Sequence, residues 1–140
     1  MGILLDGMTS SEKAARLCAE YDRAGGAAGK TVIRRVWMGQ PLTELVAKQR
    51  QVYESYAPSG RSFGTDQTIV STEPQVVATK LHTLMGATGA GSINLRVHLP
   101  GIGPAEIRSQ ISRLGREVLP EVRSLLARPT GRAGTASVAD

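Results

Sequence analysis

Apolar residues along the chain alternate between two patterns, a short extended one and a longer helical one. Four segments have the β-branched or alternating composition of strands, at residues 3–5, 31–38, 68–71 and 93–99. The first of them is too short to distinguish a strand from a helix by itself. Each is followed by a stretch with apolar residues at three- and four-residue spacing, which is typical of an amphipathic helix. The pattern therefore predicts a strand–helix order repeated four times.

Local signals predict where some of the helices begin. Thr9 with Glu12, and Thr72 with Gln75, have the spacing of a capping box, in which a hydroxyl group and a longer polar side chain cap the first turn. Pro104 suits the first turn of the last helix, because the proline nitrogen has no hydrogen to leave unpaired there. We expect helices to begin at these three places.

The order of elements indicates an α/β fold. Connections of this length suit βαβ units, and right-handed crossovers place successive strands parallel and adjacent. Four βα units form either a small open sheet or half of a TIM (β/α)8 barrel, and the periodicity leaves both possible. We expect one domain over residues 1–127. Residues 128–140 are rich in Pro, Gly, Ser and Ala, and we expect a disordered tail.

The predicted strand 93–99 has one polar face. That face carries Asn94, Arg96 and His98. A parallel strand that is covered on both sides is apolar throughout. Arg35 and Trp37 likewise share a face of the predicted strand 31–38. Polar residues near the carboxyl ends of barrel strands are typical of a ligand site, while an exposed face of an edge strand gives the same pattern.

Several residues near these strand ends are candidates for chemistry. Gly101 and Gly103 lie between a strand and the start of a helix, where free N–H groups and the helix dipole favour an anion, and a tight turn is the alternative. His98 can serve as a general acid or base, or as a ligand contact. Trp37 belongs either to the core or to a cofactor site. Two His and one Cys provide no set of metal ligands, so we expect no metal.

Composition narrows the classes of protein that remain. The 140 residues carry a net charge of +5, but acidic residues interleave with the basic ones and aromatic residues make up only 4%. This disfavours nucleic-acid binding, which usually concentrates positive charge and aromatic residues on one surface. The apolar stretches are too short to span a bilayer, and no signal-peptide pattern is visible. We therefore expect a cytoplasmic domain that binds neither nucleic acid nor membranes.

Two segments of the last predicted units resemble a known family. Ile93–Gly101 and Leu114–Arg123 look like the C-terminal end of the luciferase-like monooxygenase superfamily. The run Arg116-Glu117-Val118-Leu119-Pro120 is fairly specific to that family. Two further segments, Pro74–Leu81 and Ile33–Gly39, are similar to other parts of its members. The resemblance covers residues 1 to about 127 and corresponds to the last four units of a (β/α)8 barrel.

This resemblance implies an enzyme, a flavin- or deazaflavin-dependent oxidoreductase or monooxygenase acting on a small-molecule substrate. It implies FMN or a deazaflavin as the cofactor. Trp37, Arg96, Gly101 and Gly103 would then bind the cofactor, and His98 would be catalytic. In these roles Arg96 neutralises a phosphate or the negative charge that develops on the flavin, and His98 hydrogen-bonds to the substrate or a flavin oxygen. The glycines let the backbone approach the ligand.

The resemblance leaves out the first four units of the barrel. Half a barrel has unpaired strand edges and an uncovered inner face, both of which favour association. We therefore expect a homo-oligomer or a complementary N-terminal half as the partner. The alternative function is a truncated, non-catalytic barrel fragment that binds a partner or associates with itself.

Overall fold

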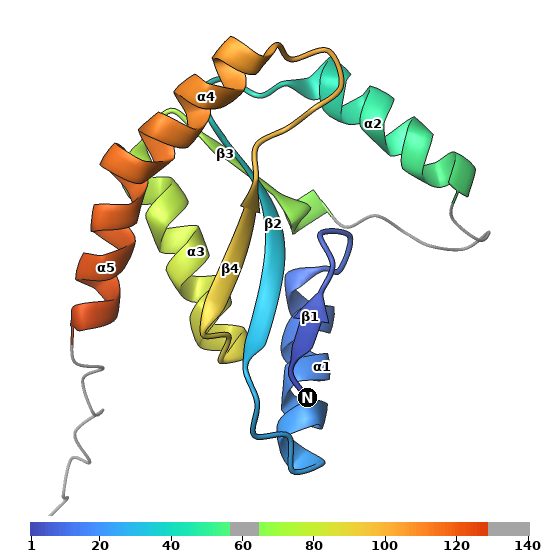
Figure 1. Ribbon diagram of the computed structural model, residues 1–140, viewed down its shortest axis with the longest axis vertical. Coiled ribbons are helices and arrows are strands. Elements are labelled where there is room, and N and C mark those ends of the chain that lie inside the picture. The colour runs from blue at the N-terminus through green and yellow to red at the C-terminus, as the bar shows by residue number, and fades with distance from the viewer. Residues whose placement is uncertain (57–64, 129–140) are drawn as a thin grey trace, which may run out of the picture.

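The computed structural model of the chain describes residues 1–56 and 65–128 (Figure 1). Its strands are β1 (Ile3–Leu5), β2 (Lys30–Met38), β3 (Thr68–Ser71) and β4 (Ser92–Arg96). Its helices are α1 (Ser11–Arg23), α2 (Thr43–Tyr56), α3 (Pro74–Thr88), α4 (Pro104–Arg113) and α5 (Leu119–Ala127). A π-helical segment, Leu114–Val118, lies between α4 and α5, and a 3₁₀ turn, Thr65–Gln67, precedes β3. The predicted α/β class and strand–helix order are confirmed. From residue 129 onward, the predicted disordered tail lies outside the described residues.

All the strand pairs within the described residues are parallel, and β2 is the central strand. Thr31 of β2 pairs with β1 and with β4, and Arg35 pairs with β3 and with β4. Because a strand has only two edges, β4 occupies one edge of β2, while β1 and β3 share the other. The nine-residue β2 is long enough for this, since β1 has three residues and β3 has four. The sheet is open.

The expectation that each strand lies beside its predecessor is therefore confirmed for β1, β2 and β3 and is wrong for β4. In the expected order β4 would pair with β3, but it pairs with β2 instead. The free edge of β2 pairs with all five residues of β4, whereas β3 is only four residues long.

One face of the sheet carries the hydrophobic core. Alternate residues Val32, Val36 and Met38 of β2 point to this face, where α1, α3 and the α4–α5 helix pack. The helix residues that meet them are Ala14, Cys18, Val77, Leu81, Leu84, Leu114, Val118 and Val122. In Figure 1, α2 instead extends from the carboxyl end of β2, away from α3 and α5. The opposite face of the sheet is therefore covered by α2 and by loops.

Strand β4 ends at Arg96, three residues before the predicted end at Leu99. Beyond it, the Gln110 side chain on α4 binds the backbone of Met38 at the end of β2. Its Oε1 accepts from the Met38 N–H at 2.9 Å, and its Nε2 donates to the Met38 carbonyl at 3.0 Å. A longer β4 would need these same Met38 groups as hydrogen-bond partners, and the Gln110 amide already occupies them. The alternation nevertheless persists, since Leu99 is buried and His98 is exposed.

The predicted helix starts are shifted by one residue in two cases. The N-cap of α1 is Ser10, whose Oγ accepts from the Lys13 N–H at 3.2 Å, because the Thr9 hydroxyl donates instead to Asp6. The N-cap of α3 is Glu73, without a side-chain cap bond, rather than Thr72. The prediction for Pro104, in the first turn of α4, is confirmed. Within residues 1–56 and 65–128, no helix combines the length and apolar character needed to cross a membrane.

Candidate functional site

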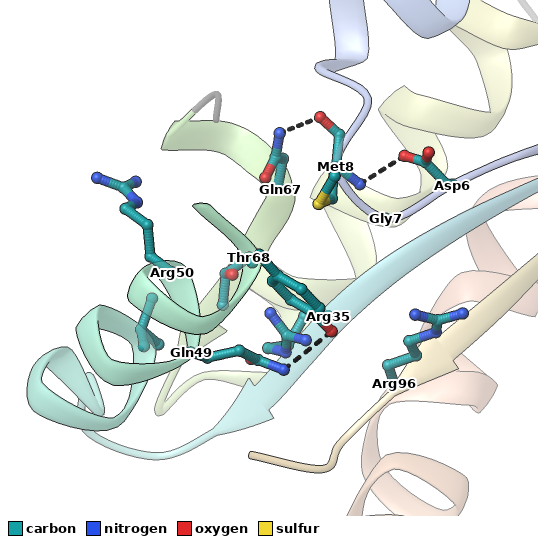
Figure 2. Close-up of a pocket in the computed structure, with 11 residues that line it drawn as sticks. Asp6, Gly7, Met8, Arg35, Gln49, Arg50, Gln67, Thr68 and Arg96 are labelled. Atoms are coloured by element: carbon teal, nitrogen blue, oxygen red, sulfur yellow. Dashed lines mark hydrogen bonds between the residues drawn. The ribbon is translucent and has the colours of Figure 1, made fainter. Parts of the chain in front are cut away.

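A cavity of about 310 Å³ lies between α2 and the face of the sheet that carries Arg35 (Figure 2). Its walls come from the loop after β1, the second half of β2, α2, the start of β3 and the last residue of β4. The volume is near the lower end of small-molecule sites. Open parallel sheets bind ligands at the carboxyl ends of their strands, which is where β1, β2 and β4 meet this cavity. The position therefore makes it the first candidate for a binding site.

Two arginines from neighbouring strands meet in this cavity. Arg35 of β2 and Arg96 of β4 are partners in the sheet register, so their side chains leave the same face. Burial lowers the pKa of Arg35, and the positive charge of Arg96 lowers it further, while a hydrogen bond with Tyr53 acts in the opposite direction. Arg50 adds a third positive charge to the wall.

The cavity wall offers these arginines little negative charge. Among the described residues that line it, Asp6 has the only carboxylate. That carboxylate accepts hydrogen bonds from the Met8 N–H at 2.8 Å and the Thr9 hydroxyl at 3.1 Å, within its own loop. The cavity is therefore positively charged and suits a ligand with anionic or electron-rich oxygens.

A buried amide side chain also lines this cavity. The Gln49 side chain is only 8% exposed, and its Nε2 donates to Tyr53 Oη at 3.1 Å. Its Oε1 has no hydrogen-bond partner among the described residues, and the same holds for Nε of Arg35. A buried polar atom without a partner costs about 1–3 kcal/mol. A bound ligand that pairs with these atoms, after a side-chain rotation that exposes them, would recover that cost.

The 3₁₀ turn before β3 holds the loop that forms one wall. Gln67 Nε2 donates to the carbonyl of Met8, and Asp66 Oδ2 accepts from the Ser11 N–H at 2.7 Å. Figure 2 shows the first of these bonds at the rim of the cavity. Residues far apart in sequence thus position the β1–α1 loop against the cavity.

The Asp66 contact predicts a pH dependence of stability. Burial raises the pKa of Asp66, but hydrogen bonds from Ser11 and the charge of Arg34 outweigh burial, so the pKa is lowered overall. A carboxyl whose pKa is lower in the folded state stabilises the fold above its ordinary pKa and loses that effect as the pH falls through the folded value. We expect the free energy of unfolding to fall more steeply in wild type than in Asp66→Asn between about pH 5 and pH 2. Urea denaturation at a series of pH values measures this, and parallel curves would contradict it.

Of the residues predicted for the site, Arg96 lines the cavity. Trp37 is on the same strand face as Arg35 but is buried and does not line the cavity. His98 is exposed beyond the end of β4. Gly101 has a φ of 92°, in the region that favours glycine, and Gly103 is the N-cap of α4. The structure thus places Arg96 in the cavity with residues of α2 and β2. The cavity is not lined by Trp37, His98, Gly101 or Gly103.

Gln49 and Tyr53 on α2 were not predicted as site residues. The signal for Gln49 was present, because it occupies a position of α2 that the helical spacing assigns to the apolar face. A polar residue at such a position is either paired in the core or directed at a ligand. Residues 1–56 and 65–128 contain no group of three or more His, Cys, Asp or Glu that could hold a metal.

Comparison with known proteins adds no assignment. No protein-family model matches the chain, and a search of curated proteins finds no significant match. The cavity and the residues that line it therefore provide the basis for a functional proposal.

Proposed function

We propose that the chain is the C-terminal half of a flavin- or deazaflavin-dependent oxidoreductase of the luciferase-like type. In this proposal the cavity between α2 and the sheet binds an electron-rich part of the cofactor. The observation that carries it is the in-register pair of Arg35 and Arg96, in a cavity wall whose one described carboxylate is engaged within its own loop. FMN and deazaflavin cofactors present phosphate oxygens and ring carbonyl oxygens, and guanidinium groups bind both. The bound cofactor supplies hydride transfer.

The residues present fit part of such a cofactor. The orphaned Nε of Arg35 needs an acceptor, and the cavity volume of about 310 Å³ admits a ring or a phosphate rather than a whole nucleotide. Exposed His98 is free to meet a substrate or a cofactor oxygen outside the cavity. Gly101 and Gly103 lie on the loop that follows β4 and allow backbone to approach the ligand.

The proposed architecture is half of a (β/α)8 barrel. Its support is the position of the cavity, because barrels place ligands at the carboxyl ends of their strands. In a closed barrel β4 would lie beside β3, whereas here it pairs with β2. Completion by an N-terminal half would therefore require β4 to change its neighbour.

Titration of the purified chain with FMN, and separately with a deazaflavin cofactor, tests the proposal through cofactor fluorescence. We expect saturable quenching by one of them at micromolar concentrations. Arg96→Ala should weaken binding by about tenfold to a hundredfold, the usual effect of losing a hydrogen bond to a charged group. Arg108→Ala is the matched control, because Arg108 is exposed on α4 and does not line the cavity. Absence of binding by both cofactors, or equal affinity of Arg96→Ala and wild type, would contradict the proposal.

A non-catalytic fragment that binds a partner is the second candidate. Leu4 on β1 is 64% exposed, and β4 pairs only with β2 among the described strands, which leaves one of its edges open. Both features favour association. We expect sedimentation of the purified chain at high micromolar concentration to show a mass above that of the monomer, and Leu4→Lys to reduce it. A strictly monomeric mass would exclude completion by a second copy and leave a separate N-terminal half as the partner.

A further inference from the structure

We propose that the cavity binds the pyrimidine edge of the flavin or deazaflavin ring, and that Gln49 accepts a hydrogen bond from the ring N3–H. The two carbonyl oxygens beside N3 then accept from Arg35 and Arg96. This inference rests on the proposed function and assigns the part of the cofactor that enters the cavity. Both cofactor classes share this edge, so the assignment holds for either.

The cavity presents donors and one buried acceptor together. Arg35 and Arg96 provide N–H donors from the sheet, and Gln49 Oε1 is an acceptor without a partner among the described residues. An ionised phosphate has acceptors only, so it would leave Gln49 Oε1 unpaired and bring like partial charges together. The ring edge reads carbonyl, N–H, carbonyl, which offers a donor between two acceptors. This order complements an amide oxygen that is accompanied by guanidinium groups.

In the structure the Gln49 amide turns its nitrogen toward Tyr53. Gln49 Nε2 donates to Tyr53 Oη at 3.1 Å, and Tyr53 in turn forms a hydrogen bond with Arg35. The nitrogen of the amide is thus occupied, and the oxygen has no partner among the described residues. Figure 2 shows Gln49 and Arg35 reaching the cavity from α2 and β2, with Arg96 on β4. The reversed amide, with Nε2 toward the cavity, would suit a phosphate instead.

The test uses the whole chain and two ring compounds without ribityl phosphate, lumiflavin and 3-methyllumiflavin. The second carries a methyl group in place of the N3 hydrogen and therefore lacks that donor. We expect lumiflavin to quench on binding and methylation to weaken binding by about tenfold or more, because a buried acceptor is left unpaired. In Gln49→Met both compounds should bind equally and weakly. Gln51→Met is the matched control on the same helix, since Gln51 is exposed, and it should keep the wild-type preference. Thermal unfolding of each variant verifies that it is folded.

The outcomes separate this inference from the proposed function. If FMN binds, lumiflavin does not, and inorganic phosphate competes with FMN, the cavity holds the phosphate, so the inference is wrong and the proposed function stands. Equal binding of the two lumiflavins by wild type, or an unchanged preference in Gln49→Met, also overturns the inference. If FMN, the deazaflavin cofactor and lumiflavin all fail to bind, the proposed function fails and the inference fails with it.

Discussion

Replacing Gln110 with leucine is expected to lower the free energy of unfolding by about 2–3 kcal/mol. The Gln110 side chain is 2% exposed and pairs both backbone groups of Met38. Leucine is close to it in volume, so the loss comes from hydrogen bonds rather than from a cavity. The Met38 N–H would be left buried without its acceptor, whereas the carbonyl keeps the bond from Arg113 at 2.8 Å. Urea denaturation measures the difference.

Gln75→Leu provides the control for this experiment. Gln75 is exposed on α3, and a surface substitution of this kind usually changes stability by less than about 0.5 kcal/mol. If Gln110→Leu costs no more than Gln75→Leu, the amide does not close the end of β2, and another explanation for the early end of β4 is needed.

The elements that the sequence predicts well are those defined by local pattern. β3 spans Thr68–Ser71 as expected, and the apolar spacing of the first helix correctly buries Ala14 and Cys18. A repeat of 2.0 or 3.6 residues is a property of neighbouring residues, so it can be recognised without knowing what packs on it. The N-cap of α1 shifted by one residue because Asp6 engages Thr9, and two candidate caps beside each other cannot be ranked by spacing alone.

The partner and the end of β4 could not be predicted from its own residues. The alternating pattern of residues 93–99 is genuine, since Val97 and Leu99 are buried, yet the backbone pairing stops at Arg96. The pairing depends on β2 having a free edge and on Gln110, which lies on a later helix. Both are contacts between distant segments, and the hydrophobic pattern contains no information about them.

In the candidate site too, local features could be predicted from the sequence, and contacts between distant segments could not. Alternation along the strand identified Arg96, because a charge on a parallel strand is unusual. Its proximity to Arg35 follows from the register between β2 and β4, which is a long-range property. Gln49 reaches the cavity only because α2 lies over this face of the sheet. The resemblance implies that Trp37 binds the cofactor and that His98 is catalytic, and both roles remain predictions.

Replacing Arg35 with methionine is expected to weaken cofactor binding by about a hundredfold without lowering the free energy of unfolding. Burial and the charge of Arg96 both lower the pKa of Arg35, and the Tyr53 hydrogen bond only partly opposes them. A lowered pKa means that the charged guanidinium is less favourable in the folded chain than in the unfolded one, so at neutral pH the charge opposes folding. Methionine keeps the packing of the aliphatic part of the side chain and removes the charge together with the Tyr53 hydrogen bond. Cofactor titration and urea denaturation of the same variant measure both effects.

The combination of the two effects distinguishes a binding arginine from a structural one. Natural proteins retain groups that oppose folding where ligand binding needs them, and removing such a group commonly raises stability while function is lost. Arg34→Met is the matched control, because Arg34 is the preceding residue of β2 but points to the opposite face, where it donates to Ser11 Oγ at 3.2 Å. That variant should keep the wild-type affinity for the cofactor. If Arg35→Met instead lowers the free energy of unfolding and binds the cofactor as wild type does, Arg35 is structural and the cavity does not bind the cofactor.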